Sequence, residues 1–210
     1  RPEGRSFPAR RAAAFAGFLL VASVGLAWAG SLAAAAFMTL GVLDNVVVYS
    51  LWLKRSSPWN IVLGSVSGGM PVAFGWAFVS GTVGLAAILA AALVVLWTPM
   101  HIWSLALRYR EDYARARIPM LPVVARETTA MRCMLATAAL LVPFSLALPL
   151  ATPALGAGYL VVAAGFGLPV LAVNLWLWMR PSRERAWLTF KFSSPYLALI
   201  FLAVVLDAVF

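Results

Sequence analysis

Apolar stretches of about 20 residues alternate along the whole chain with short polar segments, and this is the length at which a helix crosses a ~30 Å hydrocarbon core. The strands of a membrane β-barrel would instead read as ~10-residue segments of alternating hydrophobicity. The pattern therefore favours helices. It predicts about seven membrane-spanning helices, over residues 12–30, 32–53, 61–80, 83–107, 130–150, 154–179 and 193–210.

Composition excludes a soluble alternative. Of 210 residues, 63% are hydrophobic and 11% are charged, against about 25% charged in an ordinary soluble domain. A soluble fold of this length cannot cover so much apolar surface with a polar exterior. With no internal repeat and no low-complexity linker, residues 1–210 are expected to form one all-α integral membrane domain. Cys133 is the only cysteine, which excludes an intramolecular disulfide and a cysteine-rich metal site.

The net charge of +9 comes from cations on alternate connections between the expected helices. The connections after the first, third and fifth spans carry no charge. The positive-inside rule assigns the basic side to the cytoplasm. We therefore expect a multi-pass protein of the cytoplasmic membrane, with the lipid bilayer around it and no nucleic-acid partner. The basic connections hold all 16 Lys and Arg residues: Arg1, Arg5, Arg10, Arg11, Lys54, Arg55, Arg108, Arg110, Arg115, Arg117, Arg126, Arg132, Arg180, Arg183, Arg185 and Lys191.

Some residues inside the spans are unusual for a plain apolar helix. Small residues spaced four apart favour close helix packing in the third span. Asp44 lies about 15 Å inside the second span, where a carboxylate is a functional candidate unless Asn45 or another helix satisfies it. Asp207 is expected to reach the outer interface. The residues that interrupt the third span are Gly64, Gly68, Gly69 and Pro71.

The longest connection, at 108–132, carries three of the seven acidic residues among its arginines. This mixture adds nothing to topology. It does match the needs of a magnesium diphosphate, whose metal takes carboxylate oxygens and whose phosphates take Lys or Arg. The connection after the second span lies on the same side and adds two further cations. The candidate groups are Lys54, Arg55, Arg108, Arg110, Glu111 and Asp112.

The chain's only histidine, His101, lies near the cytoplasmic end of the fourth span. At about 100° per residue, His101, Arg108 and Asp112 share one helix face if the helix runs on past residue 107. A histidine inside a membrane helix is costly without a partner. It either binds a ligand or is a buried histidine that a neighbouring helix satisfies. The residues alone leave both interpretations open.

Three strings resemble the haem O synthases (protoheme IX farnesyltransferases), which belong to the UbiA-type prenyltransferase superfamily. They are VVVYSLWLKRSSPWNIVLGSVSGGMP at 46–71, LWTPMHIWSLALRYREDYARARIPMLPVV at 96–124, and LAVVLDAVF at 202–210. They occur in the order and at the spacing of that family. The resemblance covers essentially the whole chain, and it is weakest over residues 1–45.

The resemblance implies a fold of nine membrane helices around a cavity that opens toward the cytoplasm and the lipid. The seven spans would be helices three to nine of that fold. The N-terminal two helices, with their Asn-Asp-x-x-Asp-type motif, would then be missing, and we expect this fragment alone to be inactive. Some positions depart from the family's pattern: Asp44 and Asn45 stand in place of aromatic residues, Val72 and Met100 in place of prolines, and Arg117 in place of a glycine.

The resemblance further implies transfer of a farnesyl group from farnesyl diphosphate to a vinyl group of protohaem, giving haem O. Protohaem is then a substrate and Mg²⁺ the cofactor, and haem A synthase or terminal oxidase assembly factors are the expected protein partners. The implied catalytic residues are Lys54, Arg55, Glu111 and Asp112, the last two also as metal ligands. The implied substrate-binding residues are Tyr49, Asn60, His101, Trp103, Arg108, Arg110 and Tyr113.

Two alternatives remain open. A sister UbiA-type prenyltransferase would act on a quinone precursor or a lipid acceptor. A transporter or channel subunit would be no enzyme at all, and it would place charged or polar residues along both halves of a pore. The uncharged outer connections do not favour a pore.

Overall fold

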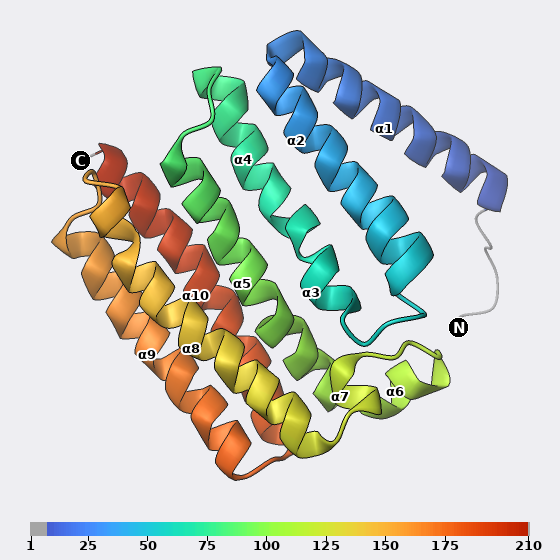
Figure 1. The fold of residues 1–210 in the computed structure, drawn as a ribbon, viewed down its shortest axis with the longest axis vertical. Coiled ribbons are helices and arrows are strands. Elements are labelled where there is room, and N and C mark those ends of the chain that lie inside the picture. Colours follow the sequence, from blue (N-terminus) through green and yellow to red (C-terminus); the bar gives the residue numbers. More distant parts are fainter. Residues whose placement is uncertain (1–7, 210) are drawn as a thin grey trace.

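The computed structural model describes residues 8–209, and these residues form helices and connecting turns without a strand. Figure 1 shows long helices lying side by side and antiparallel, with two short helices at one end of the bundle. In chain order the elements are α1 (Ala9–Gly30), α2 (Leu32–Leu43), η1 (Asp44–Leu53), α3 (Asn60–Gly64), α4 (Val66–Ser80), α5 (Leu85–Arg108), α6 (Arg110–Arg115), α7 (Leu121–Val124), α8 (Glu127–Ala151), α9 (Ala157–Met179) and α10 (Arg183–Val209).

The expectation of seven membrane spans is confirmed for the part of the chain that the structure describes. Seven helical stretches are long and apolar enough to cross a membrane. Two of them are composite, because α2 continues into η1 and α3 continues into α4. The protein is a multi-pass, all-α membrane protein.

The last span begins ten residues earlier than its apolar pattern predicts, at Arg183 instead of residue 193. The expected connection at 180–191 is therefore wrong, because most of it forms the first turns of α10. Pro181 precedes the helix, and no proline or glycine follows until Pro195. Long cationic side chains such as Lys191 can lie along a helix and keep their charged ends in water, so their presence does not end a helix.

The second half of the second span, η1, is a π-helix instead of the expected α-helix. Its i→i+5 pattern ends with the amide of Lys54 donating to the carbonyl of Tyr49 at 2.8 Å. The segment contains the run Val46-Val47-Val48, and β-branched side chains crowd the preceding turn of an α-helix. Long π-helices are rare, and short ones often mark functional sites.

Small residues bring the third span close to its neighbours, as expected. A Cβ at Gly69 of α4 would lie 2.8 Å from the carbonyl oxygen of Ala91 in α5, so these two backbones touch. A Cβ at Gly64 would lie 2.7 Å from Cδ2 of Tyr49 in η1. Both glycines are needed for packing, and the small-residue spacing is explained without a ligand.

The buried residues form two clusters along the bundle. One lies among α5, α8, α9 and α10 and includes Leu93, Leu141 and Tyr196. The other lies nearer the short helices and joins α3, α5 and α7 to α8, α9 and α10; it includes Trp103 and Met131. By contrast α1 packs mainly on α2 and leaves most of its side chains exposed, which fits a helix whose flank faces lipid.

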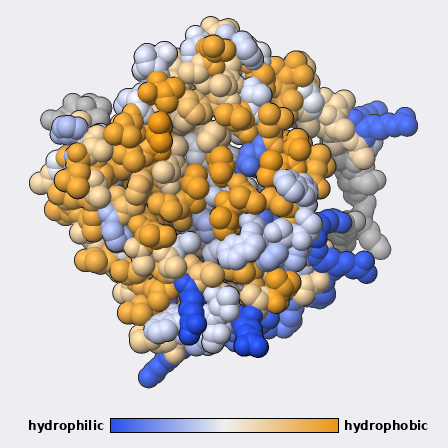
Figure 2. All heavy atoms as spheres, viewed as in Figure 1, coloured by the Kyte–Doolittle hydropathy of each residue, from blue (hydrophilic) through white to orange (hydrophobic). Residues whose placement is uncertain are grey.

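Hydrophilic side chains gather at the end of the bundle where α6 and α7 lie, while apolar side chains cover the helix flanks (Figure 2). Every basic residue that the structure describes lies in a connection at this end or in the helix turns next to it. This end is called the basic end below. Arg1 and Arg5, which are expected on the same side, lie outside the described residues.

Asp207 has a structural partner at the opposite end of the bundle. Its Oδ2 accepts hydrogen bonds from the backbone amides of Gly156 at 2.8 Å and Tyr159 at 2.9 Å, at the start of α9. The first amides of a helix lack partners within the helix, and a carboxylate also interacts favourably with the helix dipole there. Asp207 therefore caps α9 from the end of α10.

Candidate functional site

The basic end is built where α5 stops. Tyr109 has φ −108° and ψ 35°, outside the helical region, and α6 starts one residue later in a new direction. The fourth span therefore does not run on, and the expected single face with His101, Arg108 and Asp112 is wrong. The change of direction carries the carboxylates away from the membrane core and onto the surface of the basic end.

Both carboxylates of α6 are paired with arginines. Glu111 Oε1 accepts a hydrogen bond from Arg183 Nη2 at 2.5 Å, which links α6 to the first residue of α10. Asp112 is paired with Arg115 one turn further along α6. The hydrogen bond and charge of Arg183 hold the pKa of Glu111 below its usual value. A polar pocket of about 190 Å³ lies here, lined by Arg108, Tyr109, Glu111, Asp112, Arg115 and Arg183.

The second basic pair lies across α6 from this pocket. Arg55 lines a separate pocket of about 330 Å³ with the segment from Ala114 to Val124. Lys54 Nζ lies 5.6 Å from the centre of the Tyr49 ring. Arg110 donates from Nη2 to the carbonyl of Val123 at 3.2 Å and so ties α6 to α7. The structure thus brings the cations and carboxylates to one end of the bundle, where Arg108, Glu111 and Asp112 line one pocket and Arg55 lines another.

Several predicted substrate-binding residues meet in the buried cluster beneath this surface. Tyr49 and Tyr113 both pack against it, and Trp103 lies inside it with 1% of its surface exposed. Asn60 is fully buried beside them, and its Nδ2 faces the carbonyl of Lys54 at 3.4 Å. Trp103 Nε1 and Asn60 Oδ1 are buried with no hydrogen-bond partner among the described residues. Such groups are costly unless a water or ligand satisfies them.

Trp52 does not join this cluster. It is 66% exposed on η1 and is not among the residues of the cluster or those packed against it. Tyr49 and Trp103, by contrast, both belong to the region of the buried cluster.

His101 lies in a stack of aromatic rings between α5 and α10. Its ring centre is 4.1 Å from that of Trp97 and 4.3 Å from that of Phe190, with near-parallel planes. Phe190 stacks on Trp187 at 5.1 Å, and Trp187 meets Tyr109 edge-on at 6.2 Å. This stack, the aromatic column, runs from the membrane interior to the basic end. His101 Nδ1 lies 2.8 Å from Ser193 Oγ, so a neighbouring helix does satisfy it, as one interpretation of the sequence expected.

The contribution of α10 to this column was not predicted from the sequence. Trp187, Phe190 and Ser193 follow one another at intervals of three residues, which places them along one face of a helix. This three-residue spacing is visible in the sequence, but it did not indicate a helix because residues 180–191 were expected to form a connection.

The carboxylates can hold a metal ion only together with a substrate. Among the described residues, no group of three or more His, Cys, Asp or Glu side chains is placed to hold one. Magnesium usually takes one or two carboxylates and fills its remaining positions with water and substrate phosphates. Glu111 and Asp112, adjacent and exposed, offer two carboxylates that fit that mode if a metal ion takes the place of their arginine partners.

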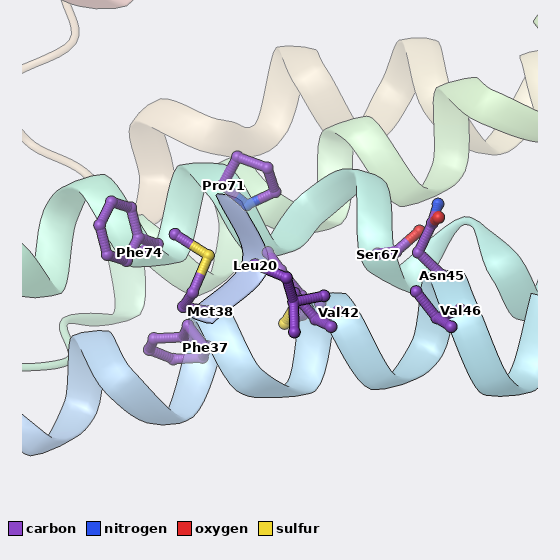
Figure 3. A pocket seen from close by; sticks show the side chains of 11 residues that line it. Leu20, Phe37, Met38, Val42, Asn45, Val46, Ser67, Pro71 and Phe74 are labelled. Atoms are coloured by element: carbon purple, nitrogen blue, oxygen red, sulfur yellow. The ribbon is translucent and has the colours of Figure 1, made fainter. Parts of the chain in front are cut away.

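A groove also opens inside the membrane-spanning region, among α1, α2 with η1, and α4 (Figure 3). It has a volume of about 330 Å³ and an apolar lining that includes Leu20, Phe37 and Phe74, with Asn45 and Ser67 near one end. Next to it Asp44 Oδ2 accepts a 2.8 Å hydrogen bond from the amide of Ser67, so a neighbouring helix satisfies this intramembrane carboxylate. None of the predicted site residues lines the groove.

Seven membrane-spanning helices with a surface of paired arginines and carboxylates at one end define a polytopic, all-helical membrane protein with a polar site at one membrane face. Residues 4–204 match the model of the UbiA prenyltransferase family. The chain belongs to that family.

Similar proteins include a protoheme IX farnesyltransferase of Desulforudis audaxviator, which is 51% identical over 208 residues covering 98% of this chain and 65% of that protein. One from Synechococcus sp. is 47% identical over 98% of this chain and 62% of its own length. Protoheme IX farnesyltransferase 2 of Cenarchaeum symbiosum is 44% identical over 83% of this chain and 58% of its own length. The chain thus spans a little under two thirds of the length of the relatives it matches.

The fold has a solved counterpart. A structure described as giving structural and mechanistic insights into the biosynthesis of digeranylgeranylglyceryl phosphate synthase in membranes superposes with a TM-score of 0.81. The superposition covers 95% of this chain and 70% of the solved chain, and the two sequences are 18% identical. At that identity the likeness is one of fold.

Proposed function

We propose that the protein containing this domain transfers a farnesyl group from farnesyl diphosphate to a vinyl group of protohaem, producing haem O. The observation that carries the proposal is the 51% identity to the protoheme IX farnesyltransferase of Desulforudis audaxviator across 98% of this chain. Because the chain spans 65% of that relative, the reaction is assigned to these seven helices together with any further segments that the gene encodes.

The reaction needs ionisation of an allylic diphosphate. The C–O bond at the first farnesyl carbon breaks and its electron pair leaves with the diphosphate. The vinyl group's electron pair then forms the new C–C bond, and water adds to the carbon beside the porphyrin and loses a proton. Preorganised cations lower the barrier by stabilising charge on the leaving group. An apolar surrounding keeps water from the allylic cation before the C–C bond forms.

The residues at the basic end suit the leaving group. Lys54, Arg55, Arg108 and Arg110 supply charge-assisted hydrogen bonds to phosphate oxygens. Glu111 and Asp112 would hold Mg²⁺ beside the diphosphate, where the ion neutralises developing negative charge. Binding then requires the ion pairs Glu111–Arg183 and Asp112–Arg115 to open, which frees both arginines for the phosphates as well.

The buried cluster beneath suits the apolar part of the reaction. Tyr49 and Trp103 present aromatic faces that stabilise a nearby cation, and Tyr113 and Asn60 border the same region. We assign the protohaem side to His101 and the aromatic column. The basic end faces the cytoplasm of a cell membrane under the positive-inside rule, so the diphosphate is taken from and released to the cytoplasm. Haem A synthase or terminal oxidase assembly factors are the proposed partners, since the product has to be handed on.

A donor and acceptor panel tests the proposal. The protein, expressed with its complete coding sequence and reconstituted in vesicles with Mg²⁺, is given farnesyl diphosphate with protohaem, a hydroxybenzoate quinone precursor, or a prenylglyceryl phosphate. Diphosphate release that requires protohaem supports the proposal. If diphosphate release instead requires the quinone precursor or the prenylglyceryl phosphate, the protein catalyses a different prenyl transfer of the same family. Geranyl diphosphate in place of farnesyl diphosphate tests the chain length of the donor.

A further inference from the structure

Two hydrogen bonds of one hydroxyl group determine which nitrogen of His101 carries the proton. Ser193 Oγ lies 2.8 Å from His101 Nδ1, and the same hydroxyl donates to the carbonyl of Phe190 at 2.8 Å. A serine hydroxyl has one hydrogen but can accept as well as donate. Both contacts are hydrogen bonds at the same time only if Nδ1 carries the proton and donates it to Ser193. The lone pair of a neutral imidazole is then on Nε2.

The surroundings of the ring leave only one edge open. Trp97 covers one face of His101 and Phe190 covers the other. Ser193, itself fully buried, occupies Nδ1. His101 keeps 7% of its surface exposed, and Nε2, on the remaining edge of the ring, makes no hydrogen bond to the residues that the structure describes.

The backbone around Ser193 is also held in place. Trp97 Nε1 donates to the carbonyl of Ser193 at 2.7 Å. Two residues of α5, Trp97 and His101, therefore contact Ser193 of α10, one through its backbone and one through its side chain. The ring and its partner thus form one preorganised unit. A neutral imidazole with a free Nε2 and a fixed Nδ1–H is the arrangement that proteins use to bind metals, and loss of the outer partner typically costs 10–100-fold in metal affinity.

We propose that Ser193 is a positioning residue that fixes His101 in the Nδ1-protonated tautomer and thereby presents the Nε2 lone pair to the iron of protohaem. The tautomer follows from the hydrogen bonds alone, whereas the choice of iron as the ligand rests on the proposed function. Coordination would hold the porphyrin against the open edge of the ring while the farnesyl group is transferred, since an imidazole nitrogen is a common axial ligand of haem iron.

The tautomer can be read without any substrate. His101 is the only histidine among these 210 residues, and comparison with a His101→Gln variant assigns its signal in a ¹⁵N-histidine spectrum. The expected spectrum at neutral pH has a protonated Nδ1 and an unprotonated Nε2. Ser194 provides a matched control, because its hydroxyl donates to the same carbonyl of Phe190 at 3.3 Å but its side chain is exposed. Ser193→Ala should shift the spectrum toward the other tautomer, and Ser194→Ala should not. A protonated Nε2 in the parent protein overturns the proposal.

A titration with protohaem tests the iron ligand. The parent protein should give the absorbance spectrum of imidazole-ligated haem, and Ser193→Ala should weaken binding 10–100-fold with loss of that spectrum. Ser193→Thr, which keeps the hydroxyl, and Ser194→Ala should both retain it. His101→Ala should lose the spectrum and regain it with added imidazole.

Haem binding and farnesyl transfer without an imidazole-ligated spectrum would overturn this inference and leave the proposed function standing. A parent protein that neither binds nor farnesylates protohaem overturns both, whereas the ¹⁵N spectrum still decides the tautomer.

Discussion

Glu111 on α6 and Arg183 at the first residue of α10 are joined by a 2.5 Å hydrogen bond, although 72 residues separate them in the chain. The pair fastens the surface helix α6 to the membrane helix α10 beside the polar pocket. It is exposed, with 53% of the arginine side chain and 69% of the glutamate side chain open to solvent. Exposed pairs contribute little to stability, so this one can open when a ligand competes for its partners.

The first prediction concerns pH. Arg183 lowers the pKa of Glu111 below its ordinary value of 4.5, so the bridge is fully formed above pH 4.5 and is lost as the pH falls through the lowered pKa. Arg183→Gln should raise the midpoint of the Glu111 titration toward the ordinary value, as measured by NMR of ¹³C-labelled glutamate carboxyls. Arg185→Gln, a neighbouring cation that lies over Trp176 instead, should leave that midpoint in place. An equal shift in the two variants would contradict a specific bridge.

The second prediction concerns Asp112. If its carboxylate positions the metal and the diphosphate, Asp112→Asn should reduce the rate of farnesyl transfer about 10²–10³-fold, by analogy with removal of one preorganised electrostatic contact. Glu127→Gln is the matched control, because Glu127 is an exposed carboxylate at the same end, in the first turn of α8. Steady-state rates in vesicles and a melting curve for each variant provide the comparison. If the Asp112→Asn variant is folded and transfers farnesyl at the rate of the parent protein, Asp112 has no role in the site.

The third prediction concerns membrane topology. With Cys133 replaced by Ala, single cysteines at Arg55 and Arg126 should react with a membrane-impermeant maleimide only from the cytoplasmic side. Cysteines at Ser80 and Ala151, at the opposite helix ends, should react only from outside, because the basic connections remain in the cytoplasm. Labelling of the Arg126 and Ser80 positions from the same side would refute the arrangement of seven spans.

The fourth prediction concerns the loop after α6. Arg117 has φ +55°, the left-handed region that only glycine enters without cost, and the resemblance noted in the sequence implies a glycine at this position. Relief of about 1–2 kcal/mol of left-handed strain is offset by the ~0.5–1 kcal/mol entropic cost of glycine. Arg117→Gly should therefore stabilise the protein by up to about 1 kcal/mol, seen as a higher melting temperature. Ala114→Gly, inside α6, should cost about 0.5–1 kcal/mol. A lower melting temperature for Arg117→Gly would show that its side chain makes a stabilising contact.

The fold was largely predictable because a membrane span depends on the length of a local apolar run. The start of α10 was not predictable in this way, because Arg183, Arg185 and Lys191 resemble a polar connection. Long cationic side chains are nevertheless tolerated in the first turns of a membrane helix. The cap that Asp207 places on α9 was hidden for another reason: it joins residues about 50 positions apart, and only the packing of α9 against α10 brings them together.

The candidate site was predictable in its residue types but not in its arrangement. The pattern of charge correctly brought Lys54, Arg55 and the α6 residues to one end of the bundle. It could not show that the chain turns at Tyr109, because the sequence around 105–112 has neither proline nor glycine to end the helix. That turn separates Asp112 from the face of His101. The partner of His101, Ser193, lies 92 residues away, and only the packing of α10 against α5 brings the two together.

The most direct measurement of the central claim is the mass spectrum of porphyrin extracted after the reconstituted protein has been incubated with protohaem, Mg²⁺ and farnesyl diphosphate deuterated at its first carbon. The account predicts a product heavier by one deuterated farnesyl group and one hydroxyl, with the new C–C bond at a former vinyl group and one diphosphate released per haem converted. Unmodified protohaem beside released diphosphate would show that the allylic cation is captured by water instead. A label found on any other acceptor would contradict the account.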